Sequence, residues 1–159
     1  MRTLAISLIT SLVLLITGCA SIRHYEGPAL PSTDIAIILE GKSFSIGSKR
    51  GGFFVSQLKS GGNTQFKDMG NRSEVLPGEV HFTFLVVRFY QPFGKQYVKS
   101  SLKFVAEAGK KYVVHGWSGP KPGVWVLDIN TGTVVGRTGE IPENTIAESK
   151  QSLLYYQRQ

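Results

Sequence analysis

The positions of hydrophobic and polar residues divide the chain into two unequal parts. Residues 4–17 are almost entirely Leu, Ile, Val, Ala, Ser and Thr, with no charge among them. From residue 34 onward, short segments of apolar or alternating residues are separated by turns that contain glycine and proline. Alternation with a period of two is typical of β-strands that bury one face, and Gly and Pro mark the reversals between them. The pattern therefore predicts an apolar leader followed by an all-β body.

Eight or nine short strands are predicted in this body. The strongest is Val80–Tyr90, which is interrupted only by His81 and Arg88. Val98–Phe104 alternates apolar residues with Lys and Ser, as a strand with one solvated face does. The other predicted strands are Asp34–Leu39, Lys42–Ile46, Phe53–Leu58, Thr64–Asp68, Lys111–Ser118, Val124–Ile129 and Thr133–Arg137. This pattern favours an antiparallel β-sandwich of the immunoglobulin-like or transthyretin-like kind, with a closed barrel as the alternative.

The pattern changes after Glu140. Asn144 is placed to cap a short helix that would carry Ile146, Lys150, Leu153 and Leu154 on one side. A tail that frays or docks on the sandwich is the alternative. The expected organisation is a leader at 1–18, a tether at 19–32, one β-sandwich domain at 33–139 and a C-terminal helix or tail at 140–159.

The apolar leader has the features of a secretory signal. It begins with Arg2 and ends in small residues, and its apolar core is shorter than the about 20 residues that a transmembrane helix needs. Its last residues, Ile16–Thr17–Gly18–Cys19, resemble the lipobox of bacterial lipoproteins. The resemblance implies that residues 1–18 are removed and that acyl chains on Cys19 bind the mature protein to a membrane. Since Cys19 is the only cysteine, neither a disulfide nor a free thiol would remain.

The residues after Cys19 indicate where the body is held. Ala20 stands where Asp commonly retains lipoproteins in the inner membrane, so the resemblance implies the periplasmic leaflet of the outer membrane. Residues 20–32 include prolines and show no strand or helix periodicity, which predicts a tether. These 13 residues could hold the body up to about 45 Å from the bilayer when fully stretched. Alternatively, Tyr25, Leu30 and the two prolines, Pro28 and Pro31, would pack along the domain edge and shorten that reach.

Basic residues outnumber acidic ones, 18 Lys and Arg against 11 Asp and Glu. Because the leader contributes only Arg2, the mature chain would carry a formal charge of +6. The basic residues are scattered along the chain, and scattered charges mainly keep a surface solvated. The excess also suits an anionic envelope polymer, lipid headgroups or an acidic protein partner, and no nucleic acid partner is expected.

Three segments are similar to turns found in a group of small proteobacterial lipoproteins. They are Leu76–His81 with its Pro-Gly turn, Ala106–Tyr112 with its Ala-Gly turn, and Trp125–Val135 with an Asp-x-x-Thr-Gly turn. The first segment also resembles PEGA-like surface modules. The resemblance implies a β-hairpin architecture between residues 19 and 137, and it brings no catalytic residue with it.

No catalytic motif in the sequence is complete. Gly41–Lys42–Ser43 lacks the glycine that a phosphate-binding loop has five places earlier, because that position is Ala36. Ser118 lies in a segment that approaches a nucleophile elbow, but Pro120 stands in place of the final glycine. These motifs therefore do not indicate an enzyme.

The histidines His24, His81 and His115 are isolated in the sequence, without a second imidazole or a thiolate at metal-ligand spacing. Structural histidines are therefore expected, with no metal and no cofactor. His115 and Asp128 lie on neighbouring predicted strands and are the pair most apt to meet, as a structural hydrogen bond rather than as a catalytic pair. We expect a non-enzymatic protein.

Trp117, Trp125 and Tyr112 lie on adjacent predicted strands. Alternating apolar residues on such strands normally build a sandwich core, and the alternative is an exposed platform on which sugar rings stack. The sequence therefore predicts a membrane-anchored envelope lipoprotein that serves as an interaction or structural module facing the periplasm. A glycan- or lipid-binding lipoprotein that uses the aromatic platform is the alternative.

Overall fold

The computed structural model describes residues 21–45, 52–60, 68–90 and 94–159. Within these ranges the chain forms nine strands and two helices. The strands are β1 (Ile22–Arg23), β2 (Ala36–Phe44), β3 (Gly52–Ser60), β4 (Arg72–Val75), β5 (Gly78–Tyr90), β6 (Gly94–Ala106), β7 (Lys111–Trp117), β8 (Gly123–Asp128) and β9 (Val134–Thr138). The helices are α2 (Glu143–Gln151) and α3 (Leu153–Gln157).

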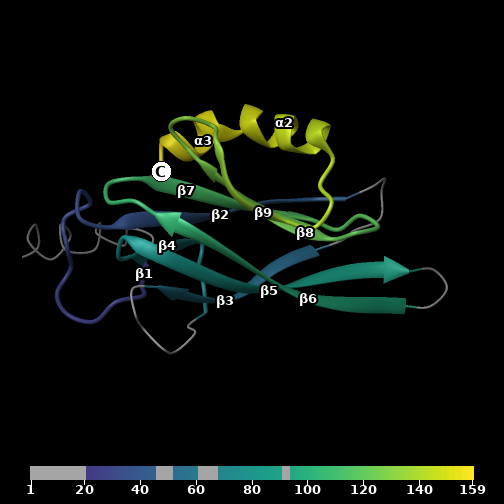
Figure 1. The fold of residues 1–159 in the computed structure, drawn as a ribbon, viewed down its shortest axis with the longest axis horizontal. Coiled ribbons are helices and arrows are strands. Elements are labelled where there is room, and N and C mark those ends of the chain that lie inside the picture. The colour runs from purple at the N-terminus through teal and green to yellow at the C-terminus, as the bar shows by residue number, and fades with distance from the viewer. Residues whose placement is uncertain (1–20, 46–51, 61–67, 91–93) are drawn as a thin grey trace, which may run out of the picture.

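The strands form two sheets, and the helices add a third layer (Figure 1). The larger sheet has the order β1-β4-β2-β7-β8-β9, and the smaller has the order β3-β5-β6. The smaller sheet packs on one face of the larger sheet, and α2 and α3 cover the other face. The prediction of a mainly β, sandwich-like fold is confirmed, with the helical layer as an addition to it.

The larger sheet is mixed rather than antiparallel as expected. β2 pairs with β7 in parallel, and β1 pairs with β4 in parallel. The chain between β2 and β7 builds the smaller sheet, so it is long enough to return in the direction of β2, as a parallel pair requires. The remaining strand pairs are antiparallel in the described part of the chain.

Most of the strongly patterned segments form strands near the predicted positions. Residues 36–39 and 42–44 of the two segments predicted at 34–39 and 42–46 belong to one strand, β2, with a register shift between Glu40 and Ser43, and Ile46 lies outside the described residues. β4 was not predicted, and of the segment predicted at 64–68 all but Asp68 lies outside the described residues. Asp68 itself is not in a strand. Long strands were thus easier to predict than the four-residue strand β4.

Both faces of the central strands β7 and β8 of the larger sheet are buried. Tyr112 and Val114 of β7 point into the core between the sheets. Val113 and Trp117, on the other side of the same strand, point into a second core beneath the helices. A strand covered on both faces has no solvated side, which is why every residue of β8 is buried.

The C-terminal segment is helical and docks on the larger sheet. The buried positions Ile146, Ser149, Leu153 and Tyr156 are spaced three or four residues apart, as one face of a helix requires. Leu154 lies outside this stripe and is exposed, so its predicted place on the packed side was wrong. The N-cap is Pro142 and not Asn144, since the helix begins one residue earlier than the predicted cap.

The segment expected to be a tether is partly docked. β1 pairs with β4, and the backbone N–H of His24 donates to the carbonyl oxygen of Glu74 at 2.9 Å. His24 and Tyr25 are buried. Tyr25 packs in the core beneath the helices, while Leu30 stays exposed. Residues 22–25 are therefore part of the folded body, and the reach expected for a free tether does not apply to them.

Candidate functional site

The three aromatic residues proposed as a platform are all buried. Trp117, Trp125 and Tyr112 are at most 5% exposed. The two tryptophans lie beneath the helices, whereas Tyr112 lies between the sheets, on the opposite face. A buried ring offers no face to a sugar, so these residues form no aromatic platform. The alternation on adjacent strands favoured a core over a platform, and the burial of all three residues agrees with that expectation.

Trp125 links the sheet to the helical layer. Its indole N–H donates to Ser149 Oγ at 3.1 Å, and the Ser149 hydroxyl donates to the carbonyl oxygen of Ile146 at 2.6 Å. Ser149 is fully buried. Because a buried indole N–H needs an acceptor, this pair fixes where α2 sits on the sheet.

His115 lies in an aromatic pocket beneath the helices. Its ring stacks on Trp125 at a centroid distance of 5.3 Å and meets Phe44 and Tyr156 edge-on at 5.7 and 5.9 Å. Burial lowers the pKa of His115 to about 4, so its imidazole is neutral at neutral pH. His115 Nε2 is buried and has no hydrogen-bond partner in the structure.

The predicted meeting of His115 with Asp128 does not occur. Tyr112, not His115, is opposite Asp128 in the register of β7 and β8. Asp128 therefore shares a sheet face with Tyr112, whereas His115 shares the opposite face with Trp125. Asp128 instead accepts the backbone N–H groups of Asn130 and Thr131 at Oδ1, at 2.8 and 3.2 Å. The Asp128 carboxylate therefore serves the turn that follows β8, a structural role.

The other histidines lie elsewhere. His24 Nε2 is 3.1 Å from Ser73 Oγ, and His81 stands on β5 between Lys59 and Lys103 of the neighbouring strands. Within the described ranges, no three His, Cys, Asp or Glu side chains gather in a way that could hold a metal ion. The histidines thus occupy three separate environments.

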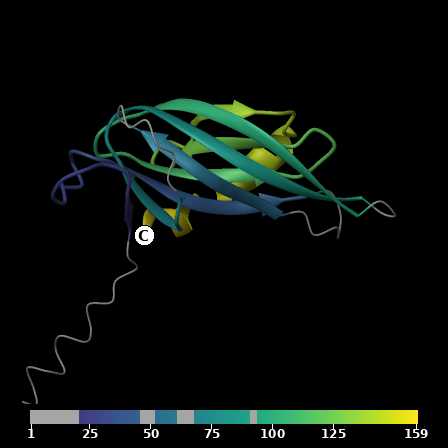
Figure 2. The same cartoon turned by 90° about the horizontal axis from the view of Figure 1, so that it is seen from below.

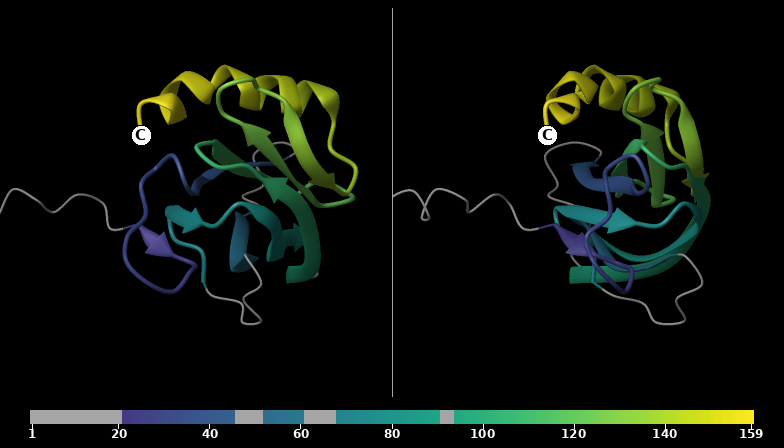
Figure 3. Two further views of the ribbon diagram at one scale, coloured as in Figure 1. Left: turned by 60° about the vertical axis from the view of Figure 1, so that its left-hand side comes forward. Right: turned by 90° about the vertical axis from the view of Figure 1, so that its left-hand side faces the viewer.

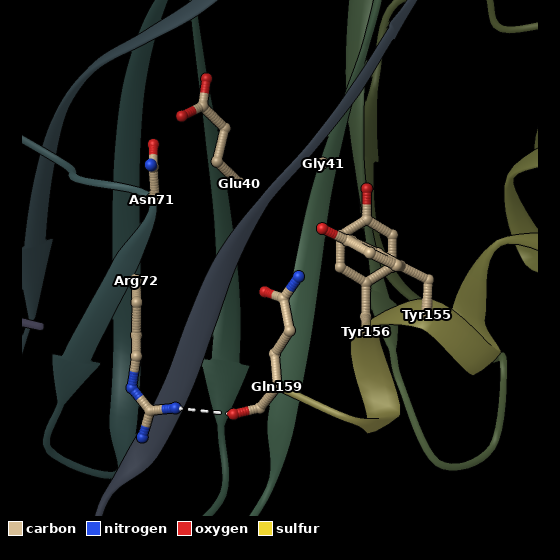
Figure 4. Close-up of a pocket in the computed structure, with 7 residues that line it drawn as sticks. All are labelled: Glu40, Gly41, Asn71, Arg72, Tyr155, Tyr156 and Gln159. Atoms are coloured by element: carbon tan, nitrogen blue, oxygen red, sulfur yellow. Dashed lines mark hydrogen bonds between the residues drawn. The ribbon is translucent and has the colours of Figure 1, made fainter. Parts of the chain in front are cut away.

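A groove opens between the end of α3 and the edge of the larger sheet (Figure 4). Its volume is about 780 Å³. It is lined by Glu40, Gly41, Asn71, Arg72, Tyr155, Tyr156 and Gln159. The groove combines one cation, one carboxylate and two phenol rings, and nothing in the sequence marked these distant residues as neighbours.

The lining of the groove combines polar side chains with two tyrosines of α3. The Arg72 guanidinium donates to the backbone oxygen of Gln159 at 3.1 Å, which ties β4 to the end of the chain beyond α3. Glu40 and Tyr155 are exposed, whereas Tyr156 is buried. Burial raises the pKa of the Tyr156 phenol, and the nearby Tyr155 and Glu40 add to this. The phenol therefore stays neutral, and the exposed groups beside it are the Glu40 carboxylate and the Tyr155 ring.

The first described residues lie beside this groove. Ile22 is opposite Ser73 in the parallel register of β1 and β4, which places Ser21 level with Arg72. The Ser21 hydroxyl donates to Glu74 Oε1 at 2.5 Å. Figure 2 shows the start of β1 and the C-terminal end at the same end of the molecule. The segment that follows Cys19 therefore enters the fold next to the groove.

Comparison with protein-family models, with curated proteins and with solved structures found no match. Among the residues that the structure describes, no helix is long and apolar enough to cross a membrane.

Proposed function

We propose that this protein is a lipid-anchored envelope protein whose β-rich body is a non-enzymatic interaction or structural module facing the periplasm. The observation that carries the proposal is the lipobox-like sequence that ends at Cys19, directly before the docked strand β1. The signal accounts for export, and acyl chains on Cys19 account for membrane attachment. By its position after the cysteine, Ala20 favours the outer membrane, on its periplasmic leaflet.

The strength of such an anchor follows from chain chemistry. Each buried methylene contributes about 0.8 kcal/mol, and one acyl chain alone binds a membrane only marginally. Two or three acyl chains on one residue hold a protein firmly. Cys19 is the only cysteine of the chain, so it is the only residue that can receive a thioether-linked lipid.

A module without catalysis is supported by the roles of the conspicuous polar groups. The Asp128 carboxylate caps a turn, His115 Nδ1 accepts the backbone N–H of Lys42, and the Ser149 hydroxyl accepts the indole of Trp125. Each of these interactions stabilises the fold. In an enzyme, such groups would instead face a cleft in reach of a substrate.

The test is affinity capture of a tagged protein after crosslinking in intact cells. We expect an envelope protein or polymer to be captured with the wild type, and its recovery to fall sharply with Cys19→Ser, which removes the anchor but not the body. Capture with neither form, together with turnover of an envelope substrate by the purified protein, would overturn the proposal.

A further inference from the structure

We propose that the groove end of the molecule lies against the bilayer and contacts phospholipid headgroups. The membrane-proximal surface consists of Ile22, Arg72, Leu154, Tyr155 and Arg158. The inference rests on the proposed function, because it takes the anchor at Cys19 as given. It adds an orientation of the body and a partner for one surface, a glycerophospholipid headgroup layer.

The chain between the lipid-bearing cysteine and the fold is short. Only Ala20 separates Cys19 from Ser21, and the Ser21 hydroxyl already bonds to Glu74. Two steps along the chain span at most about 8 Å between Cα atoms. The edge of the sheet at β1 therefore lies close to the headgroups. A free tether of 13 residues would have allowed a distance of about 45 Å between the body and the bilayer.

α3 lies on the same side of the molecule as β1 (Figure 3). β1 is one edge strand of the larger sheet and β9 is the other, and β6 packs near β9. Figure 3 shows the start of β1 and the end of α3 on one side, with β9 on the opposite side. A membrane that touches β1 thus lies next to α3 and away from β6 and β9.

The exposed residues on this side are apolar, aromatic and basic. Leu154 and Tyr155 of α3 are 69% and 64% exposed, and Ile22 of β1 is 39% exposed. Tyr155 and Arg72 line the same groove, and Arg72 bonds to Gln159, next to the exposed Arg158. Apolar and tyrosine side chains beside arginines suit the headgroup region, where the rings sit at the interface and the guanidinium groups meet phosphates.

The phospholipid assignment also accounts for the distribution of these residues on α3. Leu153 and Tyr156 are buried and hold the helix to the sheet, whereas Leu154 and Tyr155, which lie between them, and Arg158, which follows the helix, are exposed. An exposed leucine and an exposed tyrosine place apolar surface in water, which is unfavourable. The same surface is buried when the helix lies in the headgroup layer. The helix therefore has one apolar face for the protein and a second surface for the membrane.

The chain offers a matched test, because acylated Cys19 leaves no free thiol in the mature protein. Leu154→Cys and Val105→Cys place one thiol each at positions of 69% and 66% exposure, on the proximal surface and on β6. Tyr155→Cys and Tyr97→Cys form a second pair, at 64% and 57% exposure. All four positions are exposed, so these substitutions should leave the fold intact.

Each variant is purified with its lipid, labelled with a polarity-sensitive dye and reconstituted into vesicles of phosphatidylethanolamine and phosphatidylglycerol that contain a headgroup-attached quencher. Intact mass first establishes whether Cys19 is acylated. We expect dyes at 154 and 155 to be quenched at least about three times more strongly than dyes at 105 and 97, because only the former reach the interface. Equal quenching within both pairs, or stronger quenching on β6, in an acylated protein would overturn the orientation alone. Absence of the acyl groups would overturn the proposed function as well.

Discussion

The backbone N–H of Lys42 donates to His115 Nδ1 at 3.0 Å, across the parallel pair of β2 and β7. Glu40 is opposite Val114 and Ser43 is opposite Gly116, so two residues of β2 face one residue of β7 at this point. The extra residue makes a bulge, and the imidazole takes the place of a backbone acceptor. The bond also fixes the tautomer, because Nδ1 must be unprotonated to accept.

The buried imidazole predicts a pH-dependent stability. Burial lowers the pKa of His115 to about 4 from an ordinary value of 6.5, so the unfolded chain binds more protons than the folded chain between these values. Neutral His115 contributes fully to the unfolding free energy above pH 6.5. As the pH falls towards about 4, this contribution of about 3 kcal/mol is lost. Urea unfolding of the Cys19→Ser chain between neutral pH and about pH 4 measures this loss.

The matched variant is His115→Asn, which keeps an acceptor near the Nδ1 position but does not titrate. It removes a ring from the aromatic pocket, so we expect its stability at neutral pH to fall by about 2 kcal/mol. The fall in unfolding free energy between neutral pH and about pH 4 should be smaller in this variant than in the wild type, because the titration of His115 no longer contributes to it. An unchanged loss would show that other groups cause the acid sensitivity.

The bulge predicts that Gly41 cannot carry a side chain. A Cβ at this position would lie 2.5 Å from both His115 Nδ1 and the carbonyl oxygen of Val114. Because one of these atoms is backbone and the other belongs to a ring packed on three sides, Gly41→Ala should lower the unfolding free energy by about 1–3 kcal/mol. Lys42→Ala keeps the backbone N–H and changes an exposed side chain, so it should stay within about 0.5 kcal/mol of the wild type. Equal stabilities of the two variants would contradict the observed close approach.

The bond between Trp125 and Ser149 predicts a cost for Ser149→Ala. The substitution leaves the buried indole N–H without its acceptor, which costs about 1–3 kcal/mol, although alanine has the better helix propensity. Gln151→Ala, at an exposed position on the same helix, is the control and should be neutral or slightly stabilising. Chemical unfolding followed by tryptophan fluorescence compares the two, and a stabilised Ser149→Ala protein would be the contrary outcome.

The docked segment after Cys19 predicts resistance to trypsin at Arg23. Arg23 is paired with Glu74 of β4, and Tyr25 is buried two residues later, so the peptide bond after Arg23 should be protected in the folded protein. Tyr25→Ala removes the buried ring and should speed cleavage after Arg23 at least about tenfold. Leu30→Ala, at an exposed position, should have little effect. Mass analysis of the fragments released from vesicles identifies the cleavage site, and rapid cleavage of the wild type would indicate a free tether instead.

The local pattern of apolar and polar residues predicted the strands that are long enough to carry such a pattern. β5 and β6 have thirteen residues each; β5 carries a long apolar run, and residues 98–104 of β6 alternate regularly, which specifies one buried face. β1 and β4 have only two and four residues, and they are strands because β2 offers them a partner edge. Pairing between distant segments leaves little trace in a short sequence window.

The candidate site was less predictable than the fold. The buried state of Trp125 depends on α2, which covers the sheet from residues about twenty positions further along the chain. The groove brings Glu40, Arg72 and Tyr155 together from two strands and a helix, and none of the three belongs to a recognisable motif. The lipobox-like Cys19 is different, because a linear signal is read from the sequence itself.

The intact mass of the protein extracted from the membrane fraction tests the central claim most directly, with Cys19→Ser measured in parallel. The account predicts a wild-type chain that starts at Cys19 and carries a diacylglyceryl group and an amide-linked acyl chain, and a variant that is not acylated and is lost from that fraction. Recovery of the wild type as an unmodified chain of residues 1–159, or equal membrane recovery of the variant, would contradict it.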